Sequence, residues 1–482
     1  MDHISGIARE QMTLFPEAVE DYIGEDNPIR FVDAYVNSLS MQELGFAHAT
    51  VLGTGRPPYD PKVLLKLYLY GYLNRIRSSR LLERETKRNL ELFWLLQRLS
   101  PDHKTISNFR KENASALRAT FKQFVLFCKQ LDLFSADLVA IDSKKFTASN
   151  ARGRVKDAKQ LNASLKHVED SIVQYLTKLD QNDSTDDSTE ASTGLTQGAL
   201  KDKIAFLRRQ KEHLETARTE LIANEDKHIS LTDPDCRLMK NERRIEPAYS
   251  VQTAVDAKHS LIVEYELTQD AADNNHLASL AAEVKDILDR ASLTVCADAG
   301  YYDSVDLKAC EDNQIQTYVP VPRPKISKTT QVPTPAYYHD KFVYDSASDT
   351  YQCPEGKTLD YFSATTKEDG RHIGLYRTSS CVNCPQRALC TTSPRGRYIN
   401  RWEHEAVLER LKQRLLSDPS IIKRRKAIIE HIFGTIKKIW GYGALLLRRL
   451  ANVGGEVGLT LLTYNIKRTL SIVGVQKLLR AL

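Results

Sequence analysis

The sequence predicts an α/β protein: a mixed-sheet core joined to an all-α N-terminal region, a helical hairpin insertion and a small cysteine-rich insertion. Three observations lead to this prediction. Apolar residues recur with helical spacing through the first 135 residues, alternating apolar and polar residues mark strands over 232–268, and short apolar runs that end in an acid flank that region. With 482 residues, the chain is long enough for two or three domains.

The composition is that of an ordinary globular protein, with 27% charged and 41% hydrophobic residues. The net charge of +6 is too small to identify a polyanionic partner, but the clustering of the basic residues is informative. No apolar run reaches the roughly 18 residues of a membrane span, and MDHISGIARE lacks the basic-then-apolar order of a signal peptide. We therefore expect a cytoplasmic protein with no membrane partner, whose eight cysteines do not form structural disulfides.

Residues 1–135 are expected to form a helical domain with helices over 28–43, 61–75, 78–98 and 104–130. Basic residues crowd these helices. The candidates for DNA contact are Arg75, Arg77, Arg80 and Arg110. Short helices joined by tight turns are typical of a helix-turn-helix-like DNA reader, although a solvated helical bundle gives the same pattern.

Two short apolar runs predict buried strands that carry acids at their ends. The run over 137–142 ends at Asp142, with Lys144 and Lys145 directly after it, and a later run ends at Asp298. We assign 136–155 and 229–320 to one core, although an acid at a strand end is also a common turn cap.

Residues 156–228 interrupt this core. They contain two charged amphipathic helices joined by QNDSTDDSTEASTGLTQG, a polar stretch with few apolar residues. This pattern predicts an inserted antiparallel helical hairpin with a mobile tip. An arm that contacts a partner or DNA and a simple spacer are both open interpretations.

A second insertion, 321–420, contains four cysteines in two groups. Their positions are Cys353, Cys381, Cys384 and Cys390. Four thiolates, two of them in a CxxC pair, fit a structural Zn²⁺ held by short strands of a ribbon or knuckle. The long first gap and the unusual last spacing leave a redox CxxC or unliganded buried cysteines open.

The stretch KRRKAIIEHIFGTIKK begins a predicted amphipathic helix over 423–445, in a last core segment of 421–482. Glu430 is its only acid and lies seven residues before Lys437. At about 3.6 residues per turn, the two are expected on the same side of the helix. The basic residues that are candidates for DNA contact here are Lys423, Arg424, Arg425, Lys426, Lys437 and Lys438. A basic amphipathic helix is also commonly just a solvated face.

Asp142, Asp298 and Glu430 are the candidate catalytic residues, because acids on strand ends and on a helix can meet at one edge of a sheet. Clustered carboxylates repel each other unless cations neutralise them, and hard oxygen ligands favour Mg²⁺ or Mn²⁺. Two such ions about 3.5–4 Å apart can support in-line displacement at a phosphodiester. The residues therefore predict metal-dependent phosphodiester chemistry, with Lys144, Lys145 and the other lysines on the DNA backbone.

Over nearly its whole length the sequence resembles the DDE transposases of bacterial insertion sequences. The specific matches are ADAGYYD, around Asp298, and EHIFGTIK, around Glu430; AIDSKKFTASNA matches around Asp142. The resemblance implies an RNase H-like core in which these three acids form the metal-binding triad. It also implies binding of terminal inverted repeats, metal-dependent cleavage, and joining of the 3′ ends to target DNA by a homodimer or larger assembly.

The chain departs from the family's Tyr-Arg-Glu-Lys signature. Lys437 matches its lysine, but Lys423 and Lys426 stand at its tyrosine and arginine positions. Lysine keeps the charge of arginine but lacks the bidentate fork, which Arg424 or Arg425 could supply instead. The alternative functions are a DNA-binding regulator or immobile relic that binds ends without cutting, and a structural zinc protein that needs none of the three acids.

Overall fold

The computed structural model describes residues 18–50, 57–183, 197–322 and 332–482. Two compact units make up the chain. The first comprises Met1–Asp273, Glu283–Arg290 and Arg425–Leu482, and the second comprises Asn274–Ala282 and Ala291–Arg424. The first unit is therefore built from distant parts of the sequence, with helix α9 (Leu277–Leu288) divided between the two.

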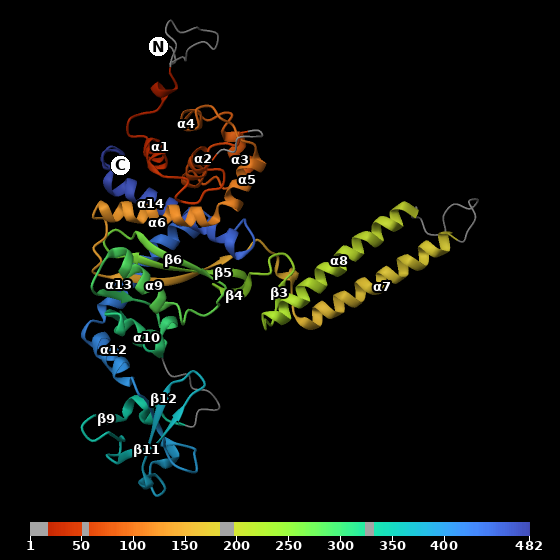
Figure 1. The fold of residues 1–482 in the computed structure, drawn as a ribbon. Helices are drawn as coiled ribbons and strands as arrows, with labels where there is room; N and C mark the ends of the chain where they lie inside the picture. Colours follow the sequence, from red (N-terminus) through yellow and green to blue (C-terminus); the bar gives the residue numbers. More distant parts are fainter. Residues whose placement is uncertain (1–17, 51–56, 184–196, 323–331) are drawn as a thin grey trace, which may run out of the picture. The chain divides into compact units, whose positions relative to one another are not determined.

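The N-terminal part of the first unit is helical, as predicted (Figure 1). After a short 3-10 turn, Val19–Tyr22, its helices are α1 (Pro28–Ser38), α2 (Pro61–Leu73), α3 (Ser79–Glu85), α4 (Leu90–Leu95), α5 (His103–Glu112) and α6 (Ala114–Gln130).

The predicted helices over 78–98 and 104–130 are each divided in two. Asn89 accepts hydrogen bonds from the backbone N–H groups of Glu91 and Leu92 and so starts α4. Asn113 lies between α5 and α6, and its side chain donates a hydrogen bond to the backbone carbonyl of Phe109. Asparagine side chains compete with helical hydrogen bonds in this way, which explains both breaks.

The sheet of the first unit is organised around β5. Its strands are β1 (Val139–Thr147), β4 (Arg237–Asn241), β5 (Arg244–Asp256) and β6 (Ile262–Thr268). β5 pairs antiparallel with each of the other three. The segment DAKHS contains the turn that joins β5 to β6, and both strands lie where the alternating pattern indicated.

The prediction that the first strand ends at Asp142 is wrong. β1 continues to Thr147, and its register runs from Val139 opposite Asp256, through Asp142 opposite Thr253, to Thr147 opposite Ala248. The partner strand β5 is long enough to pair with the polar residues after Asp142 as well as with the apolar residues before it. Asp142 therefore lies in the middle of a strand. The side chains before and after it in the sequence point to the opposite face of the sheet.

The C-terminal part of the first unit contains the predicted amphipathic and apolar helices. Its elements are α13 (Ser420–Phe433) from Arg425 onward, a π-helical turn (Gly434–Ile439), α14 (Leu450–Val473) and α15 (Val475–Ala481). The predicted helix over 423–445 therefore stops being α-helical at Gly434. The change matters because π-helical bonds join residues five apart, so the 3.6-residue spacing used for Glu430 and Lys437 does not apply beyond that point.

Helix α14 packs against both the sheet and α6. Its Asn465 side chain accepts from the backbone N–H of Ile262 and donates to the same residue's carbonyl, at 3.0 and 2.8 Å. A Cβ on Gly455 would lie 2.7 Å from Ala114 Cα, so only glycine allows α14 to approach α6 this closely. Four apolar residues of this helix are fully buried: Leu459, Leu461, Leu462 and Ile466.

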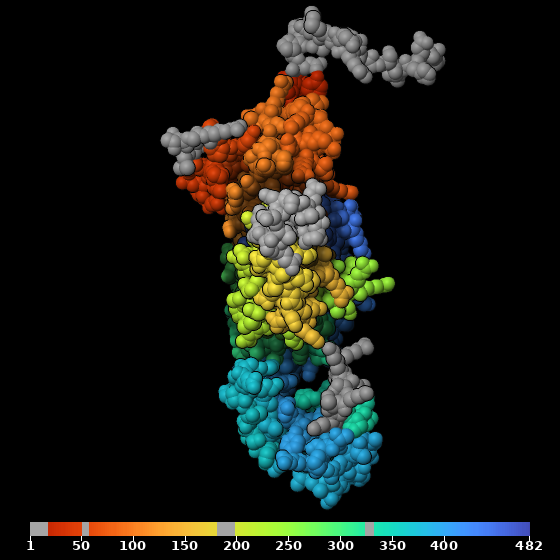
Figure 2. Space-filling view, turned by 90° about the vertical axis from the view of Figure 1, so that its right-hand side faces the viewer, coloured from red at the N-terminus to blue at the C-terminus, as the bar shows by residue number. Residues whose placement is uncertain are grey.

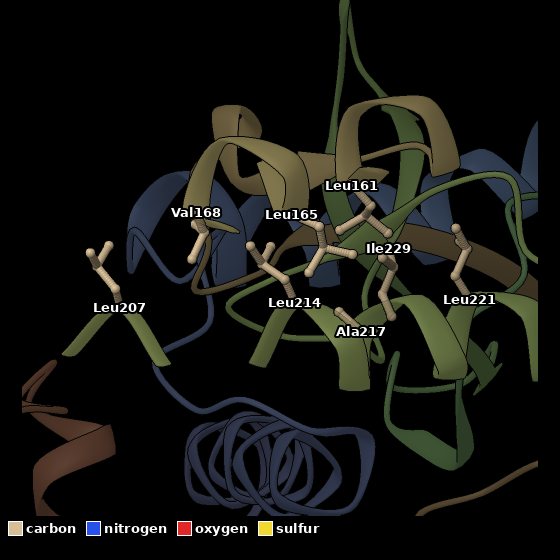
Figure 3. Packing of buried hydrophobic residues seen from close by; sticks show 8 residues of the cluster. All are labelled: Leu161, Leu165, Val168, Leu207, Leu214, Ala217, Leu221 and Ile229. Carbon is tan, nitrogen blue, oxygen red and sulfur yellow. The ribbon is translucent and has the colours of Figure 1, made fainter. Parts of the chain in front are cut away.

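The predicted hairpin consists of α7 (Ala158–Asp183) and α8 (Gln197–Ala223), which lie side by side (Figure 1). Its base has a two-stranded pairing of β2 (Val155–Lys156) with β3 (Ile229–Ser230). Leu161, Leu165 and Val168 recur at spacings of four and three along α7 and pack on residues of α8 (Figure 3). This spacing is that of a coiled-coil seam. The predicted mobile tip lies outside the described residues.

The exposed side chains of the hairpin are mainly polar and charged. Figure 2 shows the hairpin as the yellow and yellow-green atoms that face the viewer. Lys211, whose position on α8 falls in the apolar seam, pairs with Glu169 of α7 at 2.8 Å. The described part of the hairpin thus resembles a two-helix coiled coil that closes its own apolar face.

The second unit combines two parallel strands with an antiparallel sheet. β7 (Leu293–Cys296) and β8 (Ile315–Tyr318) pair in parallel, with α10 (Ser304–Asp312) between them in sequence. The antiparallel sheet has the order β13-β12-β11-β10-β9. Its strands are β9 (Val343–Asp345), β10 (Thr350–Gln352), β11 (Thr358–Thr366), β12 (His372–Arg377) and β13 (Ile399–Trp402), and α11 (Arg387–Cys390) and α12 (Glu405–Ser417) are helical.

In this part of the chain the predicted short strands around the cysteines are therefore present.

None of the helices within the described ranges is long and apolar enough to cross a membrane. The α/β class with additional helical regions is confirmed, while the domain boundaries given above for the sequence stay a prediction.

Candidate active site on β1 and α13

One face of β1 lies against α13 and the turn that follows it. Asp142, Lys144 and Phe146 alternate along the strand and so share this face. Arg425 contacts Asp142, and the ring of Phe433 lies near both the Lys144 ammonium, at 5.8 Å, and the ring of Phe146, at 6.3 Å. The helix that carries Glu430 thus runs along the strand that carries Asp142.

Asp142 is 7% exposed and has a cation on either side. Its Oδ1 accepts a hydrogen bond from the backbone N–H of Ser143 at 2.9 Å. Its Oδ2 lies 3.3 Å from Nη1 of Arg425 and 3.4 Å from Nζ of Lys144. Because a buried carboxylate is costly without a countercharge, these two cations stabilise its ionised form.

Arg425 is 9% exposed, in contrast to its neighbours Arg424 and Lys426, which are exposed. Within the described residues, its Nε and Nη1 have no hydrogen-bond acceptor, so the contact with Asp142 is an ion pair without hydrogen-bond geometry. A buried guanidinium with two such nitrogens is uncommon, since most buried polar atoms find a partner.

Glu430 and Asp298 differ from Asp142 in their surroundings. Glu430 is exposed on α13, five residues after Arg425. Asp298, in the second unit, follows β7 as predicted, and its Oδ1 accepts a hydrogen bond from the backbone N–H of Gly300 at 2.8 Å. That bond caps the short 3-10 turn Ala299–Tyr301.

Asp142, Asp298 and Glu430 do not form an assembled metal site in the described residues. Across 18–50, 57–183, 197–322 and 332–482, no three His, Cys, Asp or Glu side chains are grouped so as to hold a metal ion. What the first unit does bring together is Asp142 with its two cations, on the strand face that α13 covers.

Lys437, predicted to contact DNA, is half-buried against β1. Its ammonium donates to the backbone carbonyl of Lys145 at 3.0 Å and to Oδ1 of Asn241 at 3.3 Å, and lies 5.7 Å from the ring centre of Phe146. Burial lowers the pKa of Lys437, and the nearby charge of Lys144 acts in the same direction. The π-helical turn carries this lysine onto the strand.

The opposite face of β1 carries a separate polar network. The Lys145 ammonium donates to Oγ of Ser250 at 2.8 Å and to Oδ1 of Asp273 at 2.9 Å. Gln252 also donates to Oδ1 of Asp273. Burial alone would raise the pKa of Asp273, but hydrogen bonds from Ser143 and Lys145 outweigh it and hold that pKa below its ordinary value. Lys145 therefore neutralises an acid inside the fold.

Two arginines predicted for DNA contact are also engaged internally. Arg110 is 5% exposed, donates to the Tyr72 hydroxyl at 3.1 Å and lies over the ring of Tyr68. Arg77 lies over the ring of Tyr442 and pairs with the fully buried Glu456 at 3.4 Å. The predicted residues that remain exposed are Arg75, Arg80, Lys423, Arg424, Lys426 and Lys438.

The four predicted zinc ligands line one small cavity of about 30 Å³ in the second unit. Cys353 begins a tight turn in which its Sγ accepts a hydrogen bond from the backbone N–H of Lys357 at 3.3 Å. A Cβ on Gly396, which has φ +87°, would lie 2.7 Å from Cβ of Cys381. All eight cysteines of the chain lie within the described residues as free thiols.

Two functional or structural acids were missed by sequence analysis. Asp273 lies in the polar run QDAADNN, where no pattern distinguishes it from its neighbours. Glu456 had a usable signal, because a lone acid among the apolar residues of α14 needs a buried partner.

Comparison with known proteins adds two family matches. Residues 17–112 match a family described as a transposase domain (DUF772), and residues 352–470 match a family described as a transposase DDE domain. The second match includes the four cysteines, α13 and most of α14. No curated protein matches the chain.

Among solved structures, the cryo-EM structure of a piggyBac transposase synaptic complex with hairpin DNA matches at 8% identity. The alignment covers 94% of this chain and 79% of the other, with a TM-score of 0.34.

Proposed function

Because its two matched segments relate this chain to the DDE transposases, we propose that it binds the terminal inverted repeats of an insertion sequence, cleaves the DNA in a metal-dependent reaction and joins the 3′ ends to target DNA. The observation that carries the proposal is the buried Asp142 on β1, covered by the helix that bears Glu430. This helix lies within the segment that matches the DDE domain.

The donor set of the three acids fits Mg²⁺ or Mn²⁺. Asp142, Asp298 and Glu430 offer hard carboxylate oxygens, which these ions prefer. Asp142 is buried and depends on countercharge, and that countercharge is supplied by Lys144 and Arg425 in the structure. A divalent cation would supply the same neutralisation, together with activation of a water or a 3′-hydroxyl for attack on a phosphodiester.

In this proposal, the residues around Asp142 hold its carboxylate and the neighbouring turn in position, and the exposed basic residues neutralise the charge of the DNA backbone. The backbone N–H of Ser143 fixes one oxygen of Asp142, so that the other points toward the cations. Lys437 stays on β1 and fixes the turn after α13 against the strand. Exposed basic residues, Arg75 and Arg80 on one segment and Lys426 and Lys438 on another, are the proposed contacts with the DNA backbone.

Joining two DNA ends requires two copies of the end-binding surface, so we propose a homodimer or larger assembly on DNA. The reaction would take place in the bacterial cytoplasm, on a chromosome or plasmid. A regulator that binds ends without cutting is the alternative, and it shares the same DNA-contact residues.

The test is cleavage of a labelled duplex that carries the element's own ends. The purified chain is incubated with Mn²⁺ or with EDTA, and a duplex of equal length and shuffled sequence serves as the control. We expect cutting of the end-bearing duplex in Mn²⁺ and none in EDTA. End binding without cutting in either condition would favour the regulator instead.

We propose further that Cys353, Cys381, Cys384 and Cys390 bind a structural Zn²⁺. No three of these side chains are grouped as metal ligands in the described residues, but in support of the proposal all four line one cavity, and Cys353 Sγ accepts a hydrogen bond from the backbone N–H of Lys357. Burial raises the pKa of Cys390 to about 11, so this thiol is protonated at neutral pH without metal. Zinc would have to displace that proton, and its affinity is therefore expected to fall as the pH falls.

Metal analysis of the purified chain tests this proposal. We expect about one zinc per chain, and a loss of most of it in Cys384→Ser, because three thiolates hold zinc more weakly than four. Cys236→Ala is the matched control, since Cys236 is a buried thiol outside the cluster. Equal zinc contents of wild type and Cys384→Ser would contradict a four-cysteine site.

A further inference from the structure

The buried guanidinium of Arg425 has a role that its position in a basic run does not reveal. Lys423, Arg424 and Lys426 are exposed, as expected for residues that meet DNA, while Arg425 is 9% exposed. Its chain neighbours therefore face solvent and Arg425 faces β1. This orientation follows from the helical periodicity, because Ile428, Ile429 and Ile432 are buried on the same side of α13.

The guanidinium of Arg425 lies beside the Asp142 carboxylate, where a cation that neutralises this carboxylate would bind. Nη1 lies 3.3 Å from Oδ2 of Asp142, within ion-pair range. A divalent ion that bound this oxygen would be close to the guanidinium and would be repelled by it. Arg425 and a metal ion thus compete for the same carboxylate oxygen.

The Arg425 guanidinium also makes fewer hydrogen bonds than its N–H groups allow. Within the described residues, its Nε and Nη1 have no hydrogen-bond acceptor, although both are buried. A guanidinium presents its N–H groups in a fork that matches the paired oxygens of a phosphate. The phosphodiester of DNA is the oxyanion that the proposed function brings to this strand face.

We propose that Arg425 is a resident cation of Asp142, which a divalent metal displaces and which then binds the phosphodiester undergoing cleavage. The proposal rests on the proposed function for its second half, because the phosphodiester is the substrate of that reaction. The first half, the competition with metal, concerns Asp142 and the cations beside it, of which Lys144 stays in place when Arg425 is replaced, and it does not involve DNA. In the absence of metal, Arg425 neutralises Asp142; in its presence, the same guanidinium is free for substrate.

The test measures Mn²⁺ binding to the chain without DNA, by electron paramagnetic resonance of the free ion, for wild type and Arg425→Gln. Removing the competing charge should tighten Mn²⁺ binding roughly tenfold, which corresponds to the loss of about 1.4 kcal/mol of competition. Lys426→Gln removes the adjacent exposed charge and controls for a general electrostatic effect; it should change Mn²⁺ affinity by less than about twofold. Weaker or unchanged Mn²⁺ binding in Arg425→Gln would overturn the proposal.

Cleavage is expected to move in the opposite direction. Loss of a charged donor to the reacting phosphate costs on the order of 100-fold or more in turnover, so Arg425→Gln should bind metal more tightly and cut more slowly. A residue that only supported the fold would weaken both properties together. Unchanged cleavage in Arg425→Gln would overturn the phosphate role.

Arg425→Lys provides a second variant if Arg425→Gln does not fold. Lysine keeps the countercharge to Asp142 but loses the fork, so Mn²⁺ affinity should stay within about twofold of wild type while cleavage falls roughly tenfold or more. Full cleavage by Arg425→Lys would exclude a bidentate contact. If the wild type itself did not cut, the proposed function would fail, whereas the Mn²⁺ result would still decide the competition.

Discussion

Asp142→Asn is expected to reduce DNA cleavage by at least about 1,000-fold, which is about 4 kcal/mol of transition-state stabilisation, while end binding is retained. Asparagine has the shape of aspartate and can still accept the hydrogen bond from the Ser143 N–H. It lacks the negative charge that a divalent metal requires. The measurement is single-turnover cleavage of the labelled end duplex in Mn²⁺, with binding followed in parallel by gel shift.

Asparagine is preferred to alanine here because Asp142 is the countercharge of Arg425. Alanine would leave a buried guanidinium beside an empty space and would confuse loss of folding with loss of chemistry. Asp137→Asn is the control, since Asp137 is an exposed acid just before the same strand. The same loss is expected for Asp298→Asn and Glu430→Gln, and full cleavage by any one of the three would remove it from the triad.

Glu456→Ala is expected to destabilise the first unit by about 3–5 kcal/mol, because it removes one partner of a buried ion pair. The Glu456 carboxylate is fully buried and accepts hydrogen bonds from the backbone N–H groups of Leu446 and Leu447. It also pairs with Arg77. Alanine would leave the two backbone donors without their acceptor and would remove the countercharge of Arg77, which would keep only its hydrogen bond to the Ala444 carbonyl.

The effect is measured as the shift of the urea unfolding midpoint, followed by tryptophan fluorescence, since the buried Trp440 lies near this segment in the sequence. Glu212→Ala on the exposed surface of α8 is the control and should change stability by less than about 0.5 kcal/mol. A shift as small as that of the control would mean that the Arg77–Glu456 pair contributes little.

The elements that follow from local patterns were predicted well. The seam of α7, with Leu161, Leu165 and Val168, identifies the hairpin because the contacts are made between neighbouring helices. The alternation in β5 and β6 identifies both strands and the turn between them. Asp298 was located correctly, because an apolar strand and a glycine-bearing turn frame it.

The features that depend on distant partners could not be predicted. The apolar run predicts a strand that ends at Asp142. In the structure β1 continues through the polar residues SKKFT, because β5 pairs with them and Asp273 neutralises Lys145. Arg77 and Arg110 were assigned to the surface by their charge, whereas Glu456 and Tyr72 hold them inside. The π-helical turn after α13 has no signature in the sequence that fixes its position.

The discontinuous make-up of the first unit sets the order in which the site can form during synthesis. Asp142 and its sheet partners leave the ribosome long before Arg425 and Glu430, and α14, whose Asn465 caps the edge strand at Ile262, comes later still. Translation proceeds at about 5–20 residues per second, so roughly a quarter of a minute to one minute separates the synthesis of Asp142 from that of Arg425. A chain that terminates early lacks the helix with the acid and the arginine. Under the proposed function, products that end before α13 lack Arg425 and Glu430, and we expect them not to cut DNA.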